Sequence, residues 1–384
     1  MSNIREIATF ISDGDWIESN DQSNYGIRLV QTGNIGNGEY LDKPDKAKYI
    51  SEETCSRLNC TDVYEGDILI SRLPDPIGRS CIVPQDIGRA ITAVDCTILR
   101  VNHNIYNPQF FVYYTQTDLY KSRLSHYLTG TTRKRISRKN LENIVVPQYP
   151  KKEQDIIVNK LDMITNLISL RKQQLKNIDM LVKSRFLEMF GMSEGIDKHL
   201  EDVADICSGI TKGRKVLGLE LREVPYMAVS NVKMGYIDLS TVKTIMATEN
   251  EIEQYRLFPN DILMTEGGDP DKVGRGAIIR NPPKDCIHQN HIFRVRLHKD
   301  VLLPEFFEEY LQGNSARRYF LKAAKQTTGI ASINMKQLRA LPVKIPPIKV
   351  QIQYSDFVHQ VDKSKYREAI FLYLLEDIRI CCNI

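Results

Sequence analysis

The chain has 384 residues, of which 26% are charged and 42% are hydrophobic, and its formal net charge is only +4. This length accommodates two or three domains, and so small a net charge argues only weakly for a polyanionic partner. The first residues, MSNIREIATF, lack a basic region followed by an apolar core, and no apolar run is long enough to span a membrane. The eight cysteines form no Cys-x-x-Cys pair, so we expect a cytoplasmic protein with free thiols.

The first 150 residues alternate short β-rich runs with turns. The runs include DILISR, SCIVP and CTILRV, and they predict a curled mixed or antiparallel sheet. Asn107-Pro108 marks a helix start, because Asn is a good N-cap and Pro suits the first helical position. We predict one helix over FFVYYTQTDLYKSRLSHYL (110–128), with its aromatic face against the sheet.

A long helix is predicted over residues 151–191, between Pro150 and Gly191. Its apolar residues recur at steps of three and four, which indicates a heptad seam. The seam consists of Ile157, Leu161, Ile164, Ile168, Leu175, Ile178, Val182 and Met189. At about 1.5 Å per residue the helix would be roughly 60 Å long. One apolar seam on so long a helix requires a partner.

The second half of the chain repeats the first. IREIATFIS (4–12) matches LEDVADICS (200–208), and YEGDILIS (64–71) matches FPNDILMT (258–265). Further matches follow through loops and elements alike, at offsets between 194 and 199 residues. Such constancy indicates an internal duplication. Leu303-Pro304 opens the helix equivalent to the one after Asn107, although Leu is the poorer cap.

A second long helix begins after Pro346-Pro347. Gln351 opens it as Gln154 opens the first, and its seam consists of Tyr354, Val358 and Val361. We expect the two long helices to pack antiparallel. The apolar pattern weakens beyond Lys365, so we expect this helix to be shorter and less regular than the first.

Two basic stretches occupy equivalent positions in the two halves. Residues 119–141 contain seven Lys or Arg and no acidic residue, and residues 310–344 contain the same numbers. A single stretch would be interpreted as a solvated surface, but its repetition favours a DNA-binding patch. Each stretch contains a small polar loop, TGTTRKR (129–135) and QTTGIAS (326–332), and such loops suit close approach to phosphates and base edges.

A second candidate surface follows each DIL strand. The turn-rich loops ISRLPDPIGRS (70–80) and MTEGGDPDKVGRG (264–276) carry basic residues, and ITKGRK (210–215) is an additional basic loop in the second half. These loops diverge most between the halves. Two modules that read different targets would diverge there, although neutral drift has the same effect.

No catalytic constellation is evident. The chain contains neither a phosphate-binding Gly-x-x-x-x-Gly-Lys motif nor a Gly-x-Ser-x-Gly elbow. Asn281-Pro-Pro-Lys284 lacks the aromatic residue of an amino-methyltransferase motif and is interpreted as a turn. His288 and His291 are predicted to lie on opposite faces of one strand, which argues against a metal site. Asp75 and Asp269 lack the third acid and the Lys, at matching spacing in both halves, that a nuclease site would require. We therefore predict a binding protein without catalytic activity.

The order of these motifs, twice over, resembles the specificity subunits of type I restriction-modification systems. The resemblance implies an α+β fold with two target-recognition domains (1–149 and 192–346) joined by two long antiparallel coiled-coil helices (150–191 and 347–384). Each domain would read one half of a DNA target, and the helices would set the spacing between the halves and dock the methyltransferase subunits. It implies as partners a double-stranded DNA with a split recognition site, two methyltransferase subunits and ATP-dependent restriction subunits. S-adenosylmethionine would belong to the methyltransferases, so this chain needs no cofactor and no metal. Two alternatives remain open, a stand-alone DNA nuclease or methyltransferase and a DNA-free coiled-coil adaptor.

The resemblance and the charge pattern together nominate site residues. The DNA-binding candidates are Arg72, Arg79, Thr131, Thr132, Arg133, Lys134, Arg135, Lys272, Arg275, Lys325, Gln326, Thr327 and Thr328, with Lys212, Arg214 and Lys215 added on charge alone. The seam positions are the coiled-coil candidates, and the exposed positions of the long helices are the candidates for partner docking.

Overall fold

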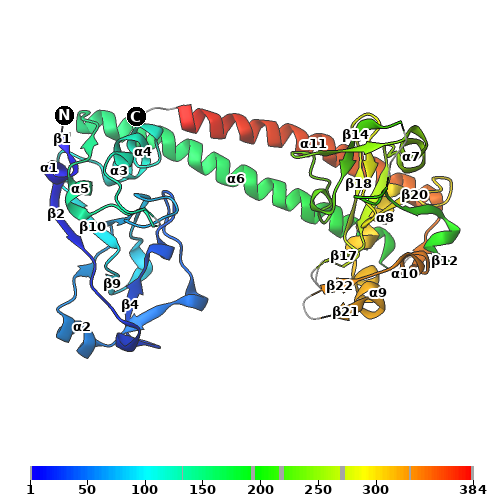
Figure 1. Cartoon of the computed structure of the whole chain (residues 1–384). Coiled ribbons are helices and arrows are strands. Elements are labelled where there is room, and N and C mark those ends of the chain that lie inside the picture. Colours follow the sequence, from blue (N-terminus) through cyan, green and yellow to red (C-terminus); the bar gives the residue numbers. More distant parts are fainter. Residues whose placement is uncertain are drawn as a thin grey trace. The chain divides into compact units, whose positions relative to one another are not determined.

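The computed structural model describes residues 2–131, 133–191, 195–215, 220–268, 273–327 and 330–381. The chain divides into two units, one formed by Met1–Lys172 with Phe371–Ile384 and the other by Gln173–Ile370 (Figure 1). Each unit contains one of the repeated α+β domains and parts of two long helices, α6 (Lys151–Phe190) and α11 (Ile348–Cys381). The predicted fold class, two repeated domains with two long helices, is confirmed.

The first domain is built on two sheets. The larger by number of residues is antiparallel, has four strands in the order β2-β10-β7-β8 and consists of Ala8–Asp13, Cys96–Val101, Ile68–Ser71 and Ser80–Ile82. The smaller has five shorter strands in the order β3-β5-β4-β9-β6, contains the parallel pair β4·β9 and consists of Gln22–Ser23, Lys48–Ile50, Ile27–Val30, Ala90–Thr92 and Asp62–Val63. The shorter elements are β1 (Ser2–Asn3), α1 (Ile4–Ile7), α2 (Glu52–Leu58), α5 (Arg138–Glu142) and β11 (Val145–Val146).

The aromatic run after Asn107 covers the larger sheet, as the sequence predicts. Phe110, Phe111 and Tyr114 are fully buried against strand residues such as Leu99. The prediction of one continuous helix is wrong, however, because the run forms α3 (Pro108–Tyr114) and α4 (Asp118–Ser125). Thr117 accounts for the break, since its hydroxyl accepts a hydrogen bond from the Tyr120 N–H and caps a new helix.

The second domain repeats this plan. Its larger sheet has the order β13-β20-β16-β18 and consists of Ala204–Ser208, Ile292–Leu297, Asp261–Thr265 and Gly276–Ile279. Its smaller sheet has the order β15-β14-β19, again with one parallel pair, and consists of Lys243–Ala247, Arg222–Met227 and Ile287–His288. The helices are α7 (Glu249–Tyr255), α8 (Pro304–Gln312), α9 (Asn314–Ala323) and α10 (Met335–Arg339), and β12 (Ile196–His199) pairs with β23 (Pro342–Ile345).

The long helices contact each other within each unit, and the contacts in the second unit show that they run in opposite directions. In the first unit Lys172 of α6 forms an ion pair with Glu376 of α11 at 2.8 Å. In the second unit Asp179 pairs with Lys365 at 2.6 Å, and the rings of Phe186 and Phe190 pack on Tyr354. Residues later in α6 therefore contact residues earlier in α11, as in an antiparallel pair. The predicted antiparallel pairing is confirmed.

The seam positions of both long helices are turned away from solvent. Leu161 and Ile168 of α6 are buried, as are Tyr354, Val358 and Val361 of α11, and the half-buried members are Ile157, Ile164, Leu175, Ile178, Val182 and Met189. The helix α11 has 34 residues against 40 in α6 and is thus shorter, as expected. It nevertheless continues as regular helix well past Lys365, so the weakened pattern there marks exposed apolar side chains and not the end of the helix.

The cysteine side chains that the structure describes are free thiols, and most are buried; these are Cys55, Cys60, Cys81, Cys96, Cys207 and Cys286. Within the described ranges no helix combines the length and the apolar character that a membrane crossing requires.

Candidate nucleic-acid interface

The first basic loop is a closed hairpin. Thr129 and Arg135 exchange two backbone hydrogen bonds of 2.9 Å each. Gly130 has φ +96°, and a Cβ there would lie 2.6 Å from the Arg133 carbonyl oxygen, so the turn requires glycine. The side chains of Thr131, Arg133, Lys134 and Arg135 are exposed. The described part of the loop therefore presents basic and hydroxyl groups to solvent beside a hydrogen-bonded pair at its base.

The loop that follows the DIL strand joins this hairpin. In the first domain the Ile136 N–H donates to the Arg72 carbonyl oxygen, at 3.3 Å. In the second domain the Ile333 N–H donates to the Glu266 carbonyl oxygen at 2.8 Å. There the association becomes a small sheet of the order β17-β22-β21, formed by Gly267–Gly268, Ile330–Ser332 and Lys325–Thr327. The two candidate surfaces that the sequence suggests in each half are one surface.

Arg79 and Arg72 lie beneath this surface. Arg79 donates to the carbonyl oxygens of Ile35, Leu73, Pro76 and Thr32 at 2.6 to 3.1 Å, and its burial lowers the pKa of the guanidinium. Arg72 is buried, donates to the Val94 carbonyl oxygen and faces Asp13 at 3.5 Å. These guanidinium groups hold the loop in its conformation, so we do not include them among the groups that would meet DNA.

The corresponding surface of the second domain is carried partly by a helix. Arg318 and Lys322 are exposed on α9 at a spacing of four residues, and Lys325 is exposed at the start of β21. Arg318 and Lys322 lie in the basic stretch but are not among the DNA-binding candidates predicted from the sequence. Their spacing of four residues, which places both on one helix face, is the signal that could have identified them. Arg275 is half-buried. Lys272, Thr132 and Thr328 lie outside the described residues, and the side chains of Gln326 and Thr327 are likewise not described.

The additional loop 210–215 is only partly free. Arg214 forms a bidentate ion pair with Glu251 of α7 and donates to the Met246 carbonyl oxygen at 3.0 Å. The pKa of the Glu251 carboxyl is lowered chiefly by its hydrogen bonds from Arg214. Lys212 and Lys215 are exposed and carry no such bond among the contacts that the structure describes. Of the three candidates that were nominated on charge, these two remain accessible to a polyanion.

The two histidines occupy different environments, and the prediction of one strand through both is wrong. His288 ends β19 and is fully buried; its burial lowers its pKa to about 4, and its Nδ1 lies 3.1 Å from the Tyr255 carbonyl oxygen. His291 lies in the turn before β20 and meets Glu266 at 2.6 Å. Within the described part of the chain no group of three or more His, Cys, Asp and Glu could hold a metal ion.

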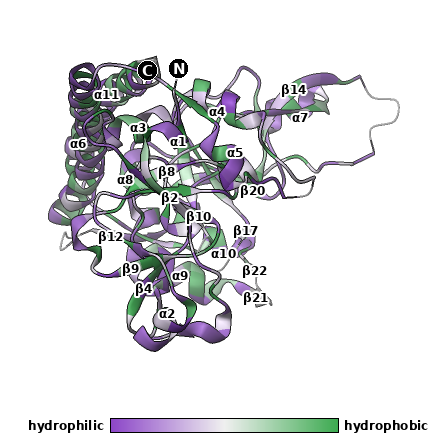
Figure 2. Cartoon of the chain, turned by 90° about the vertical axis from the view of Figure 1, so that its left-hand side faces the viewer, coloured by the Kyte–Doolittle hydropathy of each residue, from purple (hydrophilic) through white to green (hydrophobic). Residues whose placement is uncertain are grey.

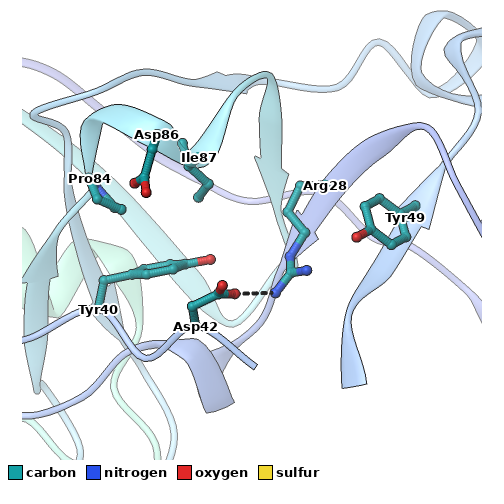
Figure 3. A pocket seen from close by; sticks show the side chains of 7 residues that line it. All are labelled: Arg28, Tyr40, Asp42, Tyr49, Pro84, Asp86 and Ile87. Carbon is teal, nitrogen blue, oxygen red and sulfur yellow. Dashed lines mark hydrogen bonds and ion pairs between the residues drawn. The ribbon is translucent and has the colours of Figure 1, made fainter. Parts of the chain in front are cut away.

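A pocket of about 190 Å³ opens on the first domain (Figure 3). Arg28 forms an ion pair with Asp42 at 3.1 Å and lies over the ring of Tyr49, while Tyr40 forms another wall. The second domain has Pro225, Ile237 and Leu239 at the positions of Arg28, Tyr40 and Asp42. The pocket therefore does not belong to the duplicated surface.

The fold and these surfaces define a class of protein, a duplicated α+β chain with a basic double loop on each repeat and paired long helices. The chain belongs to the family of the type I restriction modification DNA specificity domain, whose model matches residues 1–180 and again residues 194–369. The duplication that the sequence indicates is thus confirmed as two copies of this domain.

Curated relatives are specificity subunits of type I restriction enzymes. The EcoKI specificity subunit of Escherichia coli K12 is 25% identical over 288 residues, which cover 69% of this chain and 61% of that protein. The StySPI specificity subunit of Salmonella potsdam is 23% identical over 286 residues, with 69% and 60% covered. The matched part of the chain thus spans about 60% of the length of these relatives.

Solved structures agree in fold. A chain from a study of complex assembly and conformational transition of a type I R-M system has a TM-score of 0.62 at 17% identity, with 99% of this chain and 95% of that chain covered. The S subunit of a type I restriction-modification system from M. genitalium has a TM-score of 0.52 at 13% identity, with 98% and 92% covered. At such identities the likeness concerns the fold alone.

Proposed function

We propose that this chain is the DNA sequence-specificity subunit of a type I restriction-modification complex. Each domain, within 1–149 and 192–346, would read one half of a split double-stranded target. The observation that carries the proposal is the same surface on both repeats, a DIL-strand loop bonded to a basic loop. Basic side chains there would contact phosphates, and the polar side chains of the loops would reach base edges.

The accessible groups define which residues would carry this role. In the first domain they are Thr131, Arg133, Lys134 and Arg135, and in the second domain they are Arg318, Lys322, Lys325, Lys212 and Lys215. Exposed cations that release counterions from DNA contribute affinity that falls with salt. Arg72, Arg79 and Arg214 would act indirectly, because their guanidinium groups already bind protein carbonyl or carboxylate oxygens.

Methylation and ATP-dependent cleavage would belong to partner subunits, two methyltransferases and the restriction subunits. Exposed apolar side chains on the long helices support a docking role. On α6, Ile156, Met163 and Leu170 recur every seven residues and are 54 to 72% exposed, so they form a stripe on one helix face. On α11, exposed apolar side chains occur between Tyr366 and Ile378. Figure 2 shows hydrophobic and hydrophilic residues interspersed along the ribbon of α11. Stripes of this kind mark protein interfaces.

The docking role is testable by substitution on α6. Met163→Asp with Leu170→Asp should abolish co-purification of the chain with methyltransferase subunits, because two charges would enter an apolar interface. Asn166→Asp, an exposed position on the same helix, is the matched control and should retain the complex. Retention of the methyltransferases by the double variant would refute docking at this stripe.

The decisive experiment for the proposed function maps methylated adenines in host DNA with and without this gene. A split motif with two specific halves and a fixed gap is expected only when the gene is present. A continuous motif, or no dependence on the gene, would overturn the proposal. Methylation or cleavage by the purified chain alone, with S-adenosylmethionine and Mg²⁺, would favour a stand-alone enzyme instead.

A further inference from the structure

A buried glutamine fastens the first domain to its long helix. Gln154 lies in the first turn of α6 and is only 1% exposed. Its Oε1 accepts the Asn107 N–H at 2.8 Å, and its Nε2 donates to the carbonyl oxygens of Ile105 at 2.9 Å and Tyr149 at 2.8 Å. One side chain thus connects α6, the segment before α6 and the segment before α3.

The second domain contains the same arrangement. Gln351 lies in the first turn of α11 and is fully buried. Its Oε1 accepts the Leu303 N–H at 2.9 Å, and its Nε2 donates to the carbonyl oxygens of Val301 at 3.0 Å and Pro346 at 2.8 Å. Both amide hydrogens and one oxygen acceptor are used in each glutamine, which leaves no other buried group of the side chain to satisfy.

The residues around the two glutamines differ between the repeats. Asn107 corresponds to Leu303, and Tyr149 corresponds to Pro346. Because every partner of the glutamine is a backbone atom, those side chains are free to change while the glutamine is not. Other polar links between domain and helix differ as well. The first unit uses Tyr113 with Asp162 at 2.6 Å, and the second uses Arg280 with Asp362 at 3.3 Å.

We propose that Gln154 and Gln351 are positioning residues that fix the angle between each recognition domain and its long helix, and that they thereby set the spacer length accepted between the two DNA half-sites. This inference rests on the proposed function. A helix of 40 residues is roughly 60 Å long. A tilt of about 3° at one end of such a lever displaces the other end by about 3 Å, close to the rise of about 3.4 Å per base pair.

The test uses Gln154→Met and Gln351→Met in the full chain, assembled with its methyltransferase subunits. Methionine keeps the length of the side chain and removes its three hydrogen bonds. The packing is therefore retained, while the polar connection between the domain and its long helix is lost. Gln353→Met, an exposed position two residues further along α11, is the matched control. Binding is selected from a DNA pool in which half-site bases and spacer length both vary.

The wild-type chain and the control should prefer one spacer. In each variant, the ratio of the affinity for the preferred spacer to that for a spacer one base pair longer or shorter should fall roughly tenfold. This change corresponds to about one net hydrogen bond. Half-site base preference should remain the same, which a general loss of structure would not allow. Unchanged spacer preference in both variants overturns the inference. A wild-type chain without a split motif overturns the proposed function instead.

If a methionine variant does not fold, Gln154→Glu and Gln351→Glu provide a second measurement. Glutamate keeps the acceptor for the Asn107 or Leu303 N–H and places an oxygen against two carbonyl oxygens. Hydrogen exchange of the Asn107 and Leu303 amides reports whether the hydrogen bonds of residues 154 and 351 are broken. Broken bonds with a broadened spacer preference support the inference, and broken bonds with an unchanged spacer preference overturn it.

Discussion

The first and second domains hold their larger sheets with the same ion pair in the same kind of surroundings. Asp67 accepts two hydrogen bonds from Arg100 at 2.8 and 3.0 Å, and Asp261 accepts two from Arg296, both at 2.8 Å. The second oxygen of each carboxylate also accepts a backbone N–H, and each guanidinium lies over an aromatic ring. Interactions that recur in both repeats therefore identify the scaffold.

The two domains differ in the ionisable groups that they bury. Glu308 of the second domain stands where the first has Val112, and His288 stands where the first has Thr92. Burial raises the pKa of Glu308 to about 7 and lowers that of His288 to about 4. Two domains with one backbone plan should thus respond differently to pH.

The largest effect is expected from breaking the shared ion pair. Asp67→Ala should destabilise the first domain by about 3 kcal/mol, and Asp261→Ala should destabilise the second by a similar amount, because each leaves a partly buried arginine without its partner. Hydrogen exchange resolved by peptide would measure the loss in each domain. Asp118→Ala, which removes an exposed ion pair with Lys121, should cost about 0.5 kcal/mol or less. Unequal losses would show that the Asp67–Arg100 and Asp261–Arg296 ion pairs do not stabilise their domains to the same extent.

The second prediction concerns pH and Glu308. A carboxyl whose pKa rises on folding favours the folded state below the unfolded value of 4.5, and this contribution is lost as pH rises through about 7. The loss amounts to about 3 kcal/mol at most. Glu308→Gln should remove this decline, so the variant should exceed the wild type in stability at pH 8 and not at pH 5.

Thermal unfolding at a series of pH values would measure the Glu308 effect. Arg280 at 3.6 Å, Glu305 and Asp362 surround this carboxyl, and the substitution leaves them in place. His288 acts in the opposite sense, because its lowered pKa removes stability as pH falls below 6.5. A His288→Thr variant, which retains Glu308, should still lose stability as pH rises from 5 to 8, and a level stability over this range would contradict the assigned role of Glu308.

Repetition and periodicity were sufficient to predict the two repeated domains and the two antiparallel long helices. The sequence displays both signals directly, as segments matched at a nearly constant offset and as apolar residues at steps of three and four. The break between α3 and α4 was missed because Thr117 and its neighbours are compatible with either a helix interior or a cap. The second long helix, predicted over 347–384, is present as α11, and its apolar pattern weakens beyond Lys365 because many apolar side chains there are exposed and follow no clear period.

The candidate site was less predictable, because charge in a sequence does not reveal which way a side chain points. Arg79 and Arg133 both lie in basic, turn-rich loops, yet the first binds four carbonyl oxygens and the second is exposed. The joining of the two loops in each domain depends on backbone hydrogen bonds between distant segments. Such bonds have no signature in residue type.

The third prediction separates the two proposed DNA-binding surfaces. Replacement of Arg133, Lys134 and Arg135 by Ala should weaken binding to the first half-site roughly tenfold or more at physiological salt and reduce the salt dependence of binding. The bases selected at the second half-site should not change. Lys46→Ala with Lys48→Ala, two exposed lysines of the same domain, is the control. Equal weakening by the control would mean that the loop has no special role.

The smallest effect concerns the helix cap that only one repeat has. Asn107 accepts hydrogen bonds from the N–H groups of Gln109 and Phe110 at 2.8 and 3.2 Å, whereas Leu303 supplies no side-chain cap to α8. Asn107→Leu should therefore cost about 1 kcal/mol, and Leu303→Asn should gain up to a similar amount. Thermal unfolding of both variants would measure the difference. Destabilisation by Leu303→Asn would mean that the apolar contacts of Leu303 outweigh a cap, and that the second domain has replaced one kind of helix start with another.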